Sequence, residues 1–212
     1  MAQSKIISTE IYDNNICKII FEKDNIEFVA GQHIQIKTPN LFHFRTYSFY
    51  SSETCNEISL IFKIVLNGYL TPNLAIMKNG EYIDYKNVSG NFLSDFNDNN
   101  NNYFISNGTG IAPFHSFIKS RKVENWTLVH GAKTTNHVID SSDYNREKII
   151  LCTTEDTKGD YKGRVTQYFK NIQLERNSKF YICGSSSMII ETINILKNKG
   201  VAYDNISYEQ YY

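Results

Sequence analysis

The chain has 212 residues, and its 22 lysine and arginine residues balance 22 aspartate and glutamate residues, so the formal charge is zero. This length allows one or two domains, and the neutral balance argues against a nucleic-acid partner or a polybasic membrane anchor. The opening residues lead straight into alternating apolar and polar positions, and no run is long enough to span a bilayer, so we expect a soluble, cytoplasmic protein. The cysteines, which form no metal-type cluster and predict neither a metal site nor an iron–sulfur centre, are Cys17, Cys55, Cys152 and Cys183.

The first part of the chain carries strand patterns, in which β-branched and aromatic residues alternate with polar ones. Asn, Asp, Gly and Pro separate the patterns and indicate turns. Several short strands at such spacing predict a small antiparallel barrel. The predicted strands are 5–12, 16–21, 34–37, 46–51, 58–65 and 82–88, with a short helical segment at 73–77.

The pattern changes at residues 95–102, an Asn/Asp-rich run that we interpret as a linker or an exposed loop. Beyond it strands and helices alternate, which predicts a parallel sheet with helices on its faces. We therefore expect an antiparallel β-barrel domain over residues 1–98 and an α/β domain over residues 99–212. Its predicted strands are 103–106, 126–131, 148–154, 179–183 and 206–211, and its helices are 113–122, 165–171 and 187–199, the last ended by Gly200 as a left-handed cap.

One stretch of the barrel domain offers a cation, a flat ring and small hydroxyls. In an extended segment Arg45 and Tyr47 project one way, and Thr46 and Ser48 the other. Such a strand can set a guanidinium on a phosphate while an aromatic ring covers a planar cofactor. The alternative is a surface Arg, a core Tyr and a strand Ser.

A glycine-containing turn follows the first strand of the second domain and opens a helix. Gly108 and Gly110 let the backbone approach a ligand closely, and the free amides at a helix start favour a pyrophosphate. Tight turns also need Gly-x-Gly, and Pro113 stands where the usual dinucleotide fingerprint has its third glycine, so the turn alone does not decide the function.

Taken together, these motifs resemble the ferredoxin–NADP reductase family of flavoproteins along nearly the whole chain. Seven short motifs occur in the right order with matching spacing, and the Gly-x-Leu-Thr-Pro layout is similar to that of the compact bacterial ferredoxin/flavodoxin reductases. The motifs are Arg-Thr-Tyr-Ser at 45–48, Gly-Tyr-Leu-Thr at 68–71, Gly-Asn-Phe at 90–92, Gly-Thr-Gly-Ile-Ala-Pro-Phe at 108–114, Gly-Arg-Val at 163–165, Tyr-Ile-Cys-Gly at 181–184 and Glu-Gln-Tyr-Tyr at 209–212.

The resemblance implies an FAD site on the barrel domain. Arg45 would pair with the FAD pyrophosphate, where its planar fork suits the oxygens. Tyr47 would lie against one face of the isoalloxazine, and Ser48 would act as a catalytic residue beside flavin N5. Tyr211 or Tyr212 would cover the other face, although a frayed aromatic tail is the alternative. The other implied FAD residues are Thr46, Ile61, Lys63, Tyr69, Leu70, Thr71 and Thr109.

The resemblance also implies a nicotinamide nucleotide site on the second domain. Cys183 and Gly184 would end a strand beside the reacting carbons, with Cys183 as a catalytic residue; a small buried apolar residue is the alternative. Glu209 resembles the family's catalytic carboxylate near the flavin edge, with an ordinary surface charge as its alternative. The other implied NAD(P) residues are Gly108, Thr109, Gly110, Ala132, Lys133, Thr153, Thr154, Arg164 and Ser185.

One departure from the family pattern concerns NADPH. NADPH-selective relatives usually place Ser-Arg where this chain has Thr153 and Thr154, and the Glu155 that follows would repel a 2′-phosphate. The missing positive charge could come from Lys133, Lys158, Lys162 or Arg164. NADPH and NADH both stay open as the co-substrate.

We therefore expect an FAD-dependent oxidoreductase that moves electrons between NADPH or NADH and a small one-electron carrier, such as ferredoxin or flavodoxin, met transiently. One alternative is an NAD(P)H-dependent free-flavin reductase or the reductase component of an oxygenase. Another is a non-catalytic flavin-binding electron-transfer subunit, although relatives of that kind usually carry a cysteine cluster.

Overall fold

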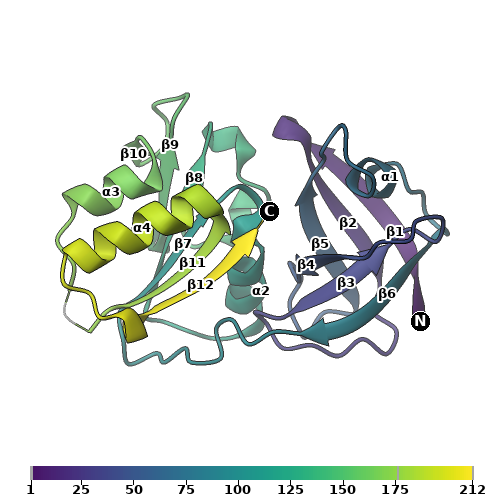
Figure 1. Ribbon diagram of the computed structural model, residues 1–212, viewed down its shortest axis with the longest axis horizontal. Helices are drawn as coiled ribbons and strands as arrows, with labels where there is room; N and C mark the ends of the chain where they lie inside the picture. Colours follow the sequence, from purple (N-terminus) through teal and green to yellow (C-terminus); the bar gives the residue numbers. More distant parts are fainter. Residues whose placement is uncertain (1, 176, 212) are drawn as a thin grey trace. The chain divides into compact units, whose positions relative to one another are not determined.

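The computed structural model describes residues 2–175 and 177–211, and the chain divides into two compact units (Figure 1). Each unit has its own sheet and hydrophobic core. The predicted domain boundary between residues 98 and 99 stays a prediction. The first unit comprises Met1–Asn91 and Ala112–Lys122, and the second comprises Phe92–Ile111 and Val123–Tyr212.

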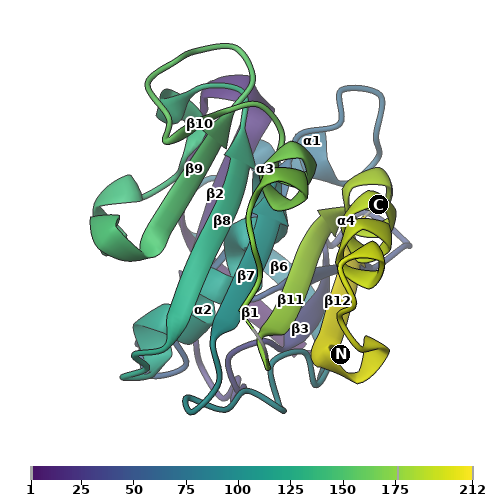
Figure 2. The same ribbon diagram turned by 90° about the vertical axis from the view of Figure 1, so that its left-hand side faces the viewer.

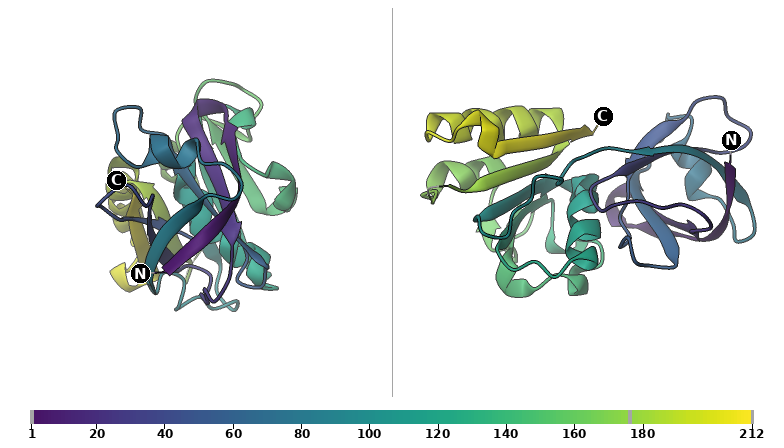
Figure 3. Two further views of the ribbon diagram at one scale, coloured as in Figure 1. Left: turned by 90° about the vertical axis from the view of Figure 1, so that its right-hand side faces the viewer. Right: turned by 90° about the horizontal axis from the view of Figure 1, so that it is seen from below.

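The first unit is the predicted antiparallel barrel, which the structure confirms (Figure 3). Its strands run in the order β4-β3-β6-β1-β2-β5. Beyond β4 the chain reaches β5, because the Tyr50 amide donates to the Ser59 carbonyl at 2.9 Å. The elements are β1 (Ala2–Tyr12), η1 (Asp13–Asn15), β2 (Ile16–Glu22), β3 (His33–Lys37), β4 (Arg45–Ser48), β5 (Glu57–Lys63), α1 (Thr71–Ala75) and β6 (Tyr82–Ser89).

The barrel core follows from the period of two along its strands. On β5, Ile58, Leu60 and Phe62 belong to the barrel's core cluster, and Ile19 and Phe21 on β2 join them there. Burying each such side chain contributes about 1.5–3 kcal/mol before the entropy of ordering is subtracted. The alternation seen in the sequence is therefore the pattern that fills the barrel.

The predicted strand 46–51 ends early, at Ser48. The amide of Phe49 donates to Gln32 at 3.1 Å, and that of Tyr50 turns to Ser59. The chain thus changes its bonding partner after Ser48, and the residues that follow do not continue the ladder of β4.

Helix α2 (Ala112–Ser120) packs against the segment that follows β4 within this unit. The His115 ring stacks on the Tyr50 ring, with centroids 3.8 Å apart, and His115 Nδ1 lies 2.7 Å from the Tyr50 carbonyl. A carbonyl only accepts, so Nδ1 carries the proton. The Ser116 hydroxyl donates to the Ser51 carbonyl at 2.7 Å. These bonds fix the segment directly after the Arg-Thr-Tyr-Ser strand.

The second unit is a six-stranded parallel sheet, as predicted, in the order β10-β9-β8-β7-β11-β12. Helices α3 (Val165–Asn171) and α4 (Ser186–Asn198) lie together on one face (Figure 2). Gly200 takes φ +83°, which confirms the predicted left-handed cap. The strands are β7 (Asn102–Asn107), β8 (Trp126–Ala132), β9 (Ile149–Thr153), β10 (Tyr161–Lys162), β11 (Lys179–Ser185) and β12 (Ile206–Tyr211).

Several short elements of the second unit were not predicted. The two-residue strand β10 extends the sheet beyond β9. The 3-10 turns are η2 (Gly108–Ile111), η3 (Thr135–His137), η4 (Ser141–Asp143), η5 (Arg146–Lys148) and η6 (Tyr203–Asn205). Short turns of this kind carry too few residues to show a hydrophobic period.

The Asn/Asp-rich run 95–102, expected to be a linker or an exposed loop, is exposed or half-buried as far as Asn101, but two of its residues anchor it to the second unit. Phe96 packs against Phe104 and Tyr181, with centroid distances of 5.9 and 6.3 Å. Asn102 begins β7, is buried, and its side-chain amide donates to the carbonyl of Asn125 at 2.8 Å. Aromatic packing and side-chain bonds to the backbone therefore anchor a run that carries few apolar residues.

Within residues 2–175 and 177–211, no helix has the length and apolar character needed to cross a membrane.

Candidate active site

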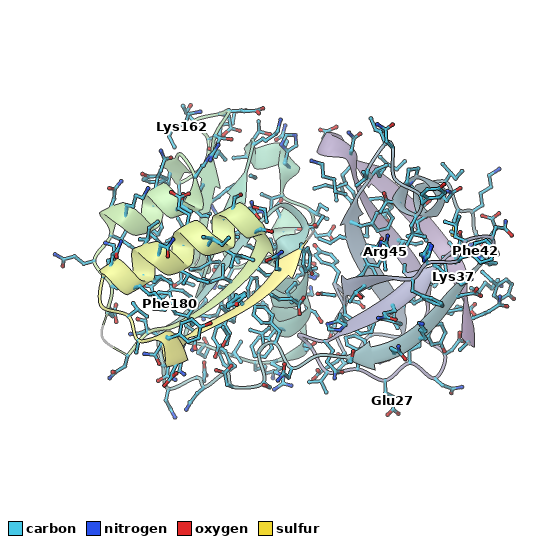
Figure 4. All side chains as sticks on the ribbon, viewed as in Figure 1. Glu27, Lys37, Phe42, Arg45, Lys162 and Phe180 are labelled. Atoms are coloured by element: carbon cyan, nitrogen blue, oxygen red, sulfur yellow. The ribbon has the colours of Figure 1, made fainter. Side chains whose placement is uncertain are left out.

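The strand Arg45–Ser48 presents its four residues in different degrees of exposure. Arg45 is exposed, and its guanidinium donates to the Phe44 carbonyl at 3.1 Å (Figure 4). Tyr47 is half-buried on the barrel core, its ring centroid 5.6 Å from that of Phe62. Burial raises the pKa of Tyr47, and the charge of Arg45 opposes this rise only in part, so the phenol keeps its proton. Ser48 is 3% exposed. The strand thus offers an open cation beside a ring that the barrel holds in place.

The loop from Val65 to Thr71 supplies a second polar edge in the same unit. The Thr71 hydroxyl accepts from the Val65 amide at 2.9 Å, and the Gly68 amide donates to the Val65 carbonyl at 2.7 Å. A hydroxyl that accepts from an amide still has a proton to donate. Tyr69 is 84% exposed, whereas Leu70 is buried in the core, so Leu70 anchors the loop and Tyr69 projects from it.

The other residues predicted for the flavin lie on β4, on β5 or in the second unit. Ile61 is buried and Lys63 is exposed, and both face away from the core side chains of β5. Thr46 is exposed on β4. Thr109 and Tyr211 belong to the second unit, and Tyr212 lies outside the described residues.

The turn after β7 packs so closely against the end of β11 that only glycine fits one position on each, Gly110 in the turn and Gly184 on the strand. A Cβ on Gly110 would meet the Cys183 carbonyl far inside van der Waals contact. Gly184 has φ +150°, and a Cβ there would collide with the side chain of Asn107. Asn107 also ties the two strand ends together: its Oδ1 accepts from the Ser185 amide at 3.0 Å, and its Nδ2 donates to the Ser185 hydroxyl at 3.0 Å. Hydrogen bonds from Asn107 therefore join the carboxyl ends of β7 and β11 into one edge of closely packed backbone.

Cys183 and Glu209 lie opposite each other on β11 and β12. Cys183 is fully buried. Burial raises its pKa well above the ordinary thiol value, the charge of Glu209 raises it further, and a hydrogen bond with Tyr211 acts in the opposite direction. The thiol is therefore protonated at neutral pH and acts as a small apolar or weakly donating group, not as a thiolate nucleophile.

A third part of the edge is built where β8 and β9 end, at Ala132 and Thr153, which pair across the two strands. The Thr153 hydroxyl donates to the Asp156 carbonyl at 3.1 Å. Its proton is therefore already used in a hydrogen bond within the loop after β9. Lys133 Nζ lies 3.0 Å from the Glu155 carboxylate. Thr154 is exposed.

The Asp156 carboxylate organises the loop after β9. It accepts from the Thr135 amide at 2.8 Å and from the Thr135 hydroxyl at 3.1 Å. The amide of Lys158 is a further donor, at 3.2 Å. These donors lower the pKa of Asp156 to about 2, and the Thr135 amide has the largest effect. The carboxylate is therefore charged at any physiological pH.

Arg164 stands at the start of α3 and is exposed; its amide donates to the Gln167 side chain at 2.9 Å. Since the sheet is parallel, the carboxyl ends of β7, β8, β9 and β11 meet at one edge, and the residues predicted for the nucleotide gather there. Sequence reasoning missed two residues that build this edge, Asn107 and Asp156. Asn107 could have been found from its place between a predicted strand and a glycine turn. No sequence signal pointed to Asp156, because its partner Thr135 is distant in the chain.

The donor set on each unit fits the cofactor that its pattern implies. On the barrel, an open guanidinium, a supported aromatic ring and a hydroxyl match the phosphate and ring parts of a flavin dinucleotide. On the parallel sheet, the turn after β7 holds Gly108 at φ +53° with open space where a Cβ would stand, and such a bare backbone matches close approach of a pyrophosphate to backbone amides.

Comparison with known proteins agrees with both assignments. Residues 5–93 match the family model described as the oxidoreductase FAD-binding domain, and residues 104–193 match that of the oxidoreductase NAD-binding domain. The class is therefore that of oxidoreductases that join an FAD-binding and an NAD-binding domain. The chain belongs to the ferredoxin–NADP reductase family of flavoproteins.

Individual relatives differ in what they are named for. The flavohemoprotein of Bacillus subtilis is 29% identical over 207 residues, which cover 86% of this chain and 51% of the relative. The ferredoxin–NADP reductase of Azotobacter vinelandii is 28% identical over 209 residues, covering 84% of this chain and 81% of the relative. The chain thus spans about half the length of the flavohemoproteins it matches.

Among solved structures, a ferredoxin NADP+ reductase from Neisseria gonorrhoeae with bound FAD and NADP matches with a TM-score of 0.89 and 20% identity. The match covers 99% of this chain and 98% of that one. At this identity the likeness shows the fold, and it agrees with the barrel and the parallel sheet described above.

Proposed function

We propose that the chain moves electrons between NADPH or NADH and a small one-electron carrier. The main support is that an FAD-binding pattern and an NAD-binding pattern follow each other along the chain. Each pattern contains residues whose chemistry suits its cofactor. When bound, FAD supplies the exchange between a two-electron donor and one-electron acceptors. The protein's own part is to bind, orient and exclude water.

On the barrel unit, Arg45 binds phosphate oxygens through its fork of donors, and the Thr71 hydroxyl donates a hydrogen bond to the same group. Tyr47 supports the flavin ring from one side, because packing against Phe62 fixes its ring plane. Ser48 donates a hydrogen bond at the reacting edge of the ring. Residues flanking this site are Thr46, Ile61, Lys63, Tyr69 and Leu70.

On the α/β unit, the amides of Gly108 to Gly110 bind the nucleotide pyrophosphate. The protonated, buried Cys183 and Gly184, at the end of β11, shape the position of the nicotinamide ring. Glu209 holds a carboxylate next to Cys183. The remaining residues of the proposed nucleotide site are Thr109, Ala132, Lys133, Thr153, Thr154, Arg164, Ser185 and Tyr211.

The relatives are named for different electron acceptors, so the acceptor of this chain has to be found by experiment. One is the Azotobacter ferredoxin–NADP reductase, and another is the electron transfer component of toluate 1,2-dioxygenase from Pseudomonas putida, 22% identical over 203 residues. We propose ferredoxin or flavodoxin as a transient partner, with free flavin or an oxygenase component as the second candidate. We also propose that the protein acts in the cytoplasm, and its four free thiols support this location.

Purified protein loaded with FAD tests the proposal. We expect a yellow protein that NADH or NADPH bleaches without oxygen and that then reduces ferredoxin, flavodoxin or free FMN to different extents. A protein that cannot be loaded with FAD, or one that neither nucleotide bleaches, would refute it.

Replacing Ser48 with Ala tests its role separately. We expect slower flavin reduction with FAD still bound, because a hydrogen bond at the reacting edge is lost. Ser4→Ala is the matched control, since Ser4 is an equally buried serine on β1 of the same barrel. Equal reduction rates for the Ser48 and Ser4 variants would remove Ser48 from the reaction.

A further inference from the structure

A polar cavity lies at the amino edge of the parallel sheet, where its strands begin. Strands β7 and β8 start side by side at this edge (Figure 2), with Asn102 paired to Trp126. The volume of the cavity is about 180 Å³. The six residues of β7 span roughly 20 Å, so a ligand here stays clear of the carboxyl edge and its proposed nucleotide site. The residues that line the cavity include Asn101, Asn102, Tyr103, Glu124, Trp126 and Glu175.

Asn102 places a buried oxygen without a partner in the wall of this cavity. The residue is 2% exposed, and its Oδ1 accepts no hydrogen bond from residues 2–175 and 177–211. Its Nδ2 donates at 2.9, 2.7 and 2.8 Å to the carbonyls of Asn97, Asn100 and Asn125. These three acceptors fix which end of the amide is the oxygen. A buried acceptor without a partner is rare, so Asn102 points to a donor that the described residues do not supply.

Other N–H groups around the cavity are already used. The Asn101 side-chain amide donates to the Glu175 carboxylate. The indole Nε1 of Trp126 donates to the Val123 carbonyl at 3.1 Å. The wall therefore offers mainly oxygen acceptors, and a ligand that suits it must bring its own donors.

The cavity also carries a negative charge that is not neutralised. The Glu124 carboxylate is paired with Lys148, whose Nζ lies 2.9 Å away. Glu175 has no such lysine or arginine in the part of the chain that the structure describes. Burial raises the pKa of Tyr103, and the charge of Glu175 raises it further, so this charge acts on the wall of the cavity. A positively charged ligand is the one that fits.

We propose that this cavity binds a guanidinium group, which brings one positive charge and several N–H donors in a fixed plane. Its fork of donors pairs with the Glu175 carboxylate, and a further N–H supplies the donor that Asn102 Oδ1 lacks. The plane of the group stacks on the Trp126 ring at the cavity wall. This site is separate from the flavin and nucleotide sites and does not rest on the function proposed above.

A metal ion suits the cavity less well. Calcium takes about six to eight oxygen ligands, whereas this wall has a single carboxylate without a cation. Among the described residues, neither Glu124 nor Glu175 belongs to a group of three metal-ligating side chains. The volume equals about six times a water molecule's share of the liquid, so a bare ion would leave most of it to water.

Trp126 is the only tryptophan of the chain, so its indole N–H gives one NMR signal that reports on the cavity wall. The experiment titrates the isotope-labelled full chain with methylguanidinium chloride at constant ionic strength. We expect a saturable shift of this signal with a Kd of about 1 mM. Tetramethylammonium has the same charge but no N–H donor, and we expect no saturable shift with it or with calcium.

Three variants test the residues that carry the proposal. Glu175→Gln removes the charge and should weaken binding about ten-fold. Lys148→Met leaves Glu124 without its cation and should tighten binding about three-fold, because a second negative charge then faces the ligand. Glu191→Gln is the matched control and should leave the Kd unchanged, since Glu191 is a glutamate of the same unit on α4, paired with Lys170.

A peptide, N-acetyl-Gly-Arg-Gly amide, distinguishes the source of the guanidinium group. Binding at least as tight as that of methylguanidinium assigns the site to an arginine side chain of a protein, and weaker binding assigns it to a free small cation. The inference is overturned by the absence of a saturable shift with methylguanidinium, by an equal shift with tetramethylammonium or calcium, or by equal Kd values for Glu175→Gln and Glu191→Gln. The titration needs neither FAD nor turnover, so its result stands whether or not the proposed electron transfer is found.

Discussion

His130 provides a quantitative test of the second unit, because burial should make its protonation state control stability. It lies on β8, opposite Ser106 on β7, and is 2% exposed. Its Nδ1 is 2.8 Å from the Ser106 hydroxyl. Burial lowers the pKa of His130 from 6.5 to about 4, so the imidazole is neutral in the folded chain at neutral pH.

The sign and size of the effect follow from linkage. The unfolded chain binds a proton near pH 6.5, whereas the folded chain resists it until about pH 4. The contribution of His130 is therefore complete above pH 6.5 and is lost as the pH falls toward 4. The loss amounts to about 2 kcal/mol by pH 5 and about 3 kcal/mol in full.

Urea unfolding of wild type and of His130→Asn from pH 7.5 down to pH 5 measures this term, since the difference between the two proteins cancels other titrating groups. We expect the gap in unfolding free energy to narrow by about 2 kcal/mol over that range. Two parallel curves would refute the reasoning. If the variant does not fold, NMR titration of the wild-type imidazole replaces it, and a His130 signal that titrates near pH 6.5 would be the contrary result.

Three further predictions concern both units. Replacing Lys37 with Met leaves Asp84 charged and buried with the Gln3 amide beside it but no cation, and we expect urea unfolding to show a loss of about 3–5 kcal/mol; a loss below about 1 kcal/mol would contradict a buried pair. Gly184→Ala forces a Cβ into Asn107 at φ +150°, so we expect it to cost about 1–3 kcal/mol and to abolish detectable NAD+ binding; wild-type affinity in a calorimetric titration would argue against the proposed edge. Cys55 is exposed and the other three cysteines are buried, so a thiol reagent should modify one thiol quickly in the native protein and four after denaturation; two or more fast thiols would contradict this burial.

Controls separate stability from function in the first two cases. The variant Lys37→Met/Asp84→Leu should regain part of the loss, because an apolar pair removes the stranded charge. Lys170→Met breaks the exposed pair with Glu191, 2.9 Å apart, and should cost at most about 1 kcal/mol. Circular dichroism of Gly184→Ala at the titration temperature checks that the sheet is intact.

The regular elements could be predicted because their physical signal is local. Period-two alternation in β2 and β5 places Ile19, Phe21, Ile58 and Leu60 in one core, and the period alone is enough to expect strands there. The left-handed residue Gly200 follows from the same kind of local rule. Strand and helix alternation likewise predicted the parallel sheet.

What could not be predicted depends on contacts between residues far apart in the chain. Strand β4 ends where Phe49 and Tyr50 change partners to Gln32 and Ser59, which no local pattern reveals. The run 95–102 has a linker's composition, yet Asn102 is buried by its bonds to the backbone. At the carboxyl edge of the parallel sheet, the sequence pointed to the residues of the glycine turn. It did not point to the Asp156 carboxylate or to its partner Thr135.

The central claim is that this chain holds FAD on its barrel unit and passes electrons to it from a nicotinamide nucleotide. Anaerobic stopped-flow mixing of FAD-loaded protein with NADH and, separately, with NADPH tests it most directly. The account predicts a saturable loss of the flavin's visible absorbance with at least one of the two nucleotides. An absorbance that neither nucleotide changes would contradict it.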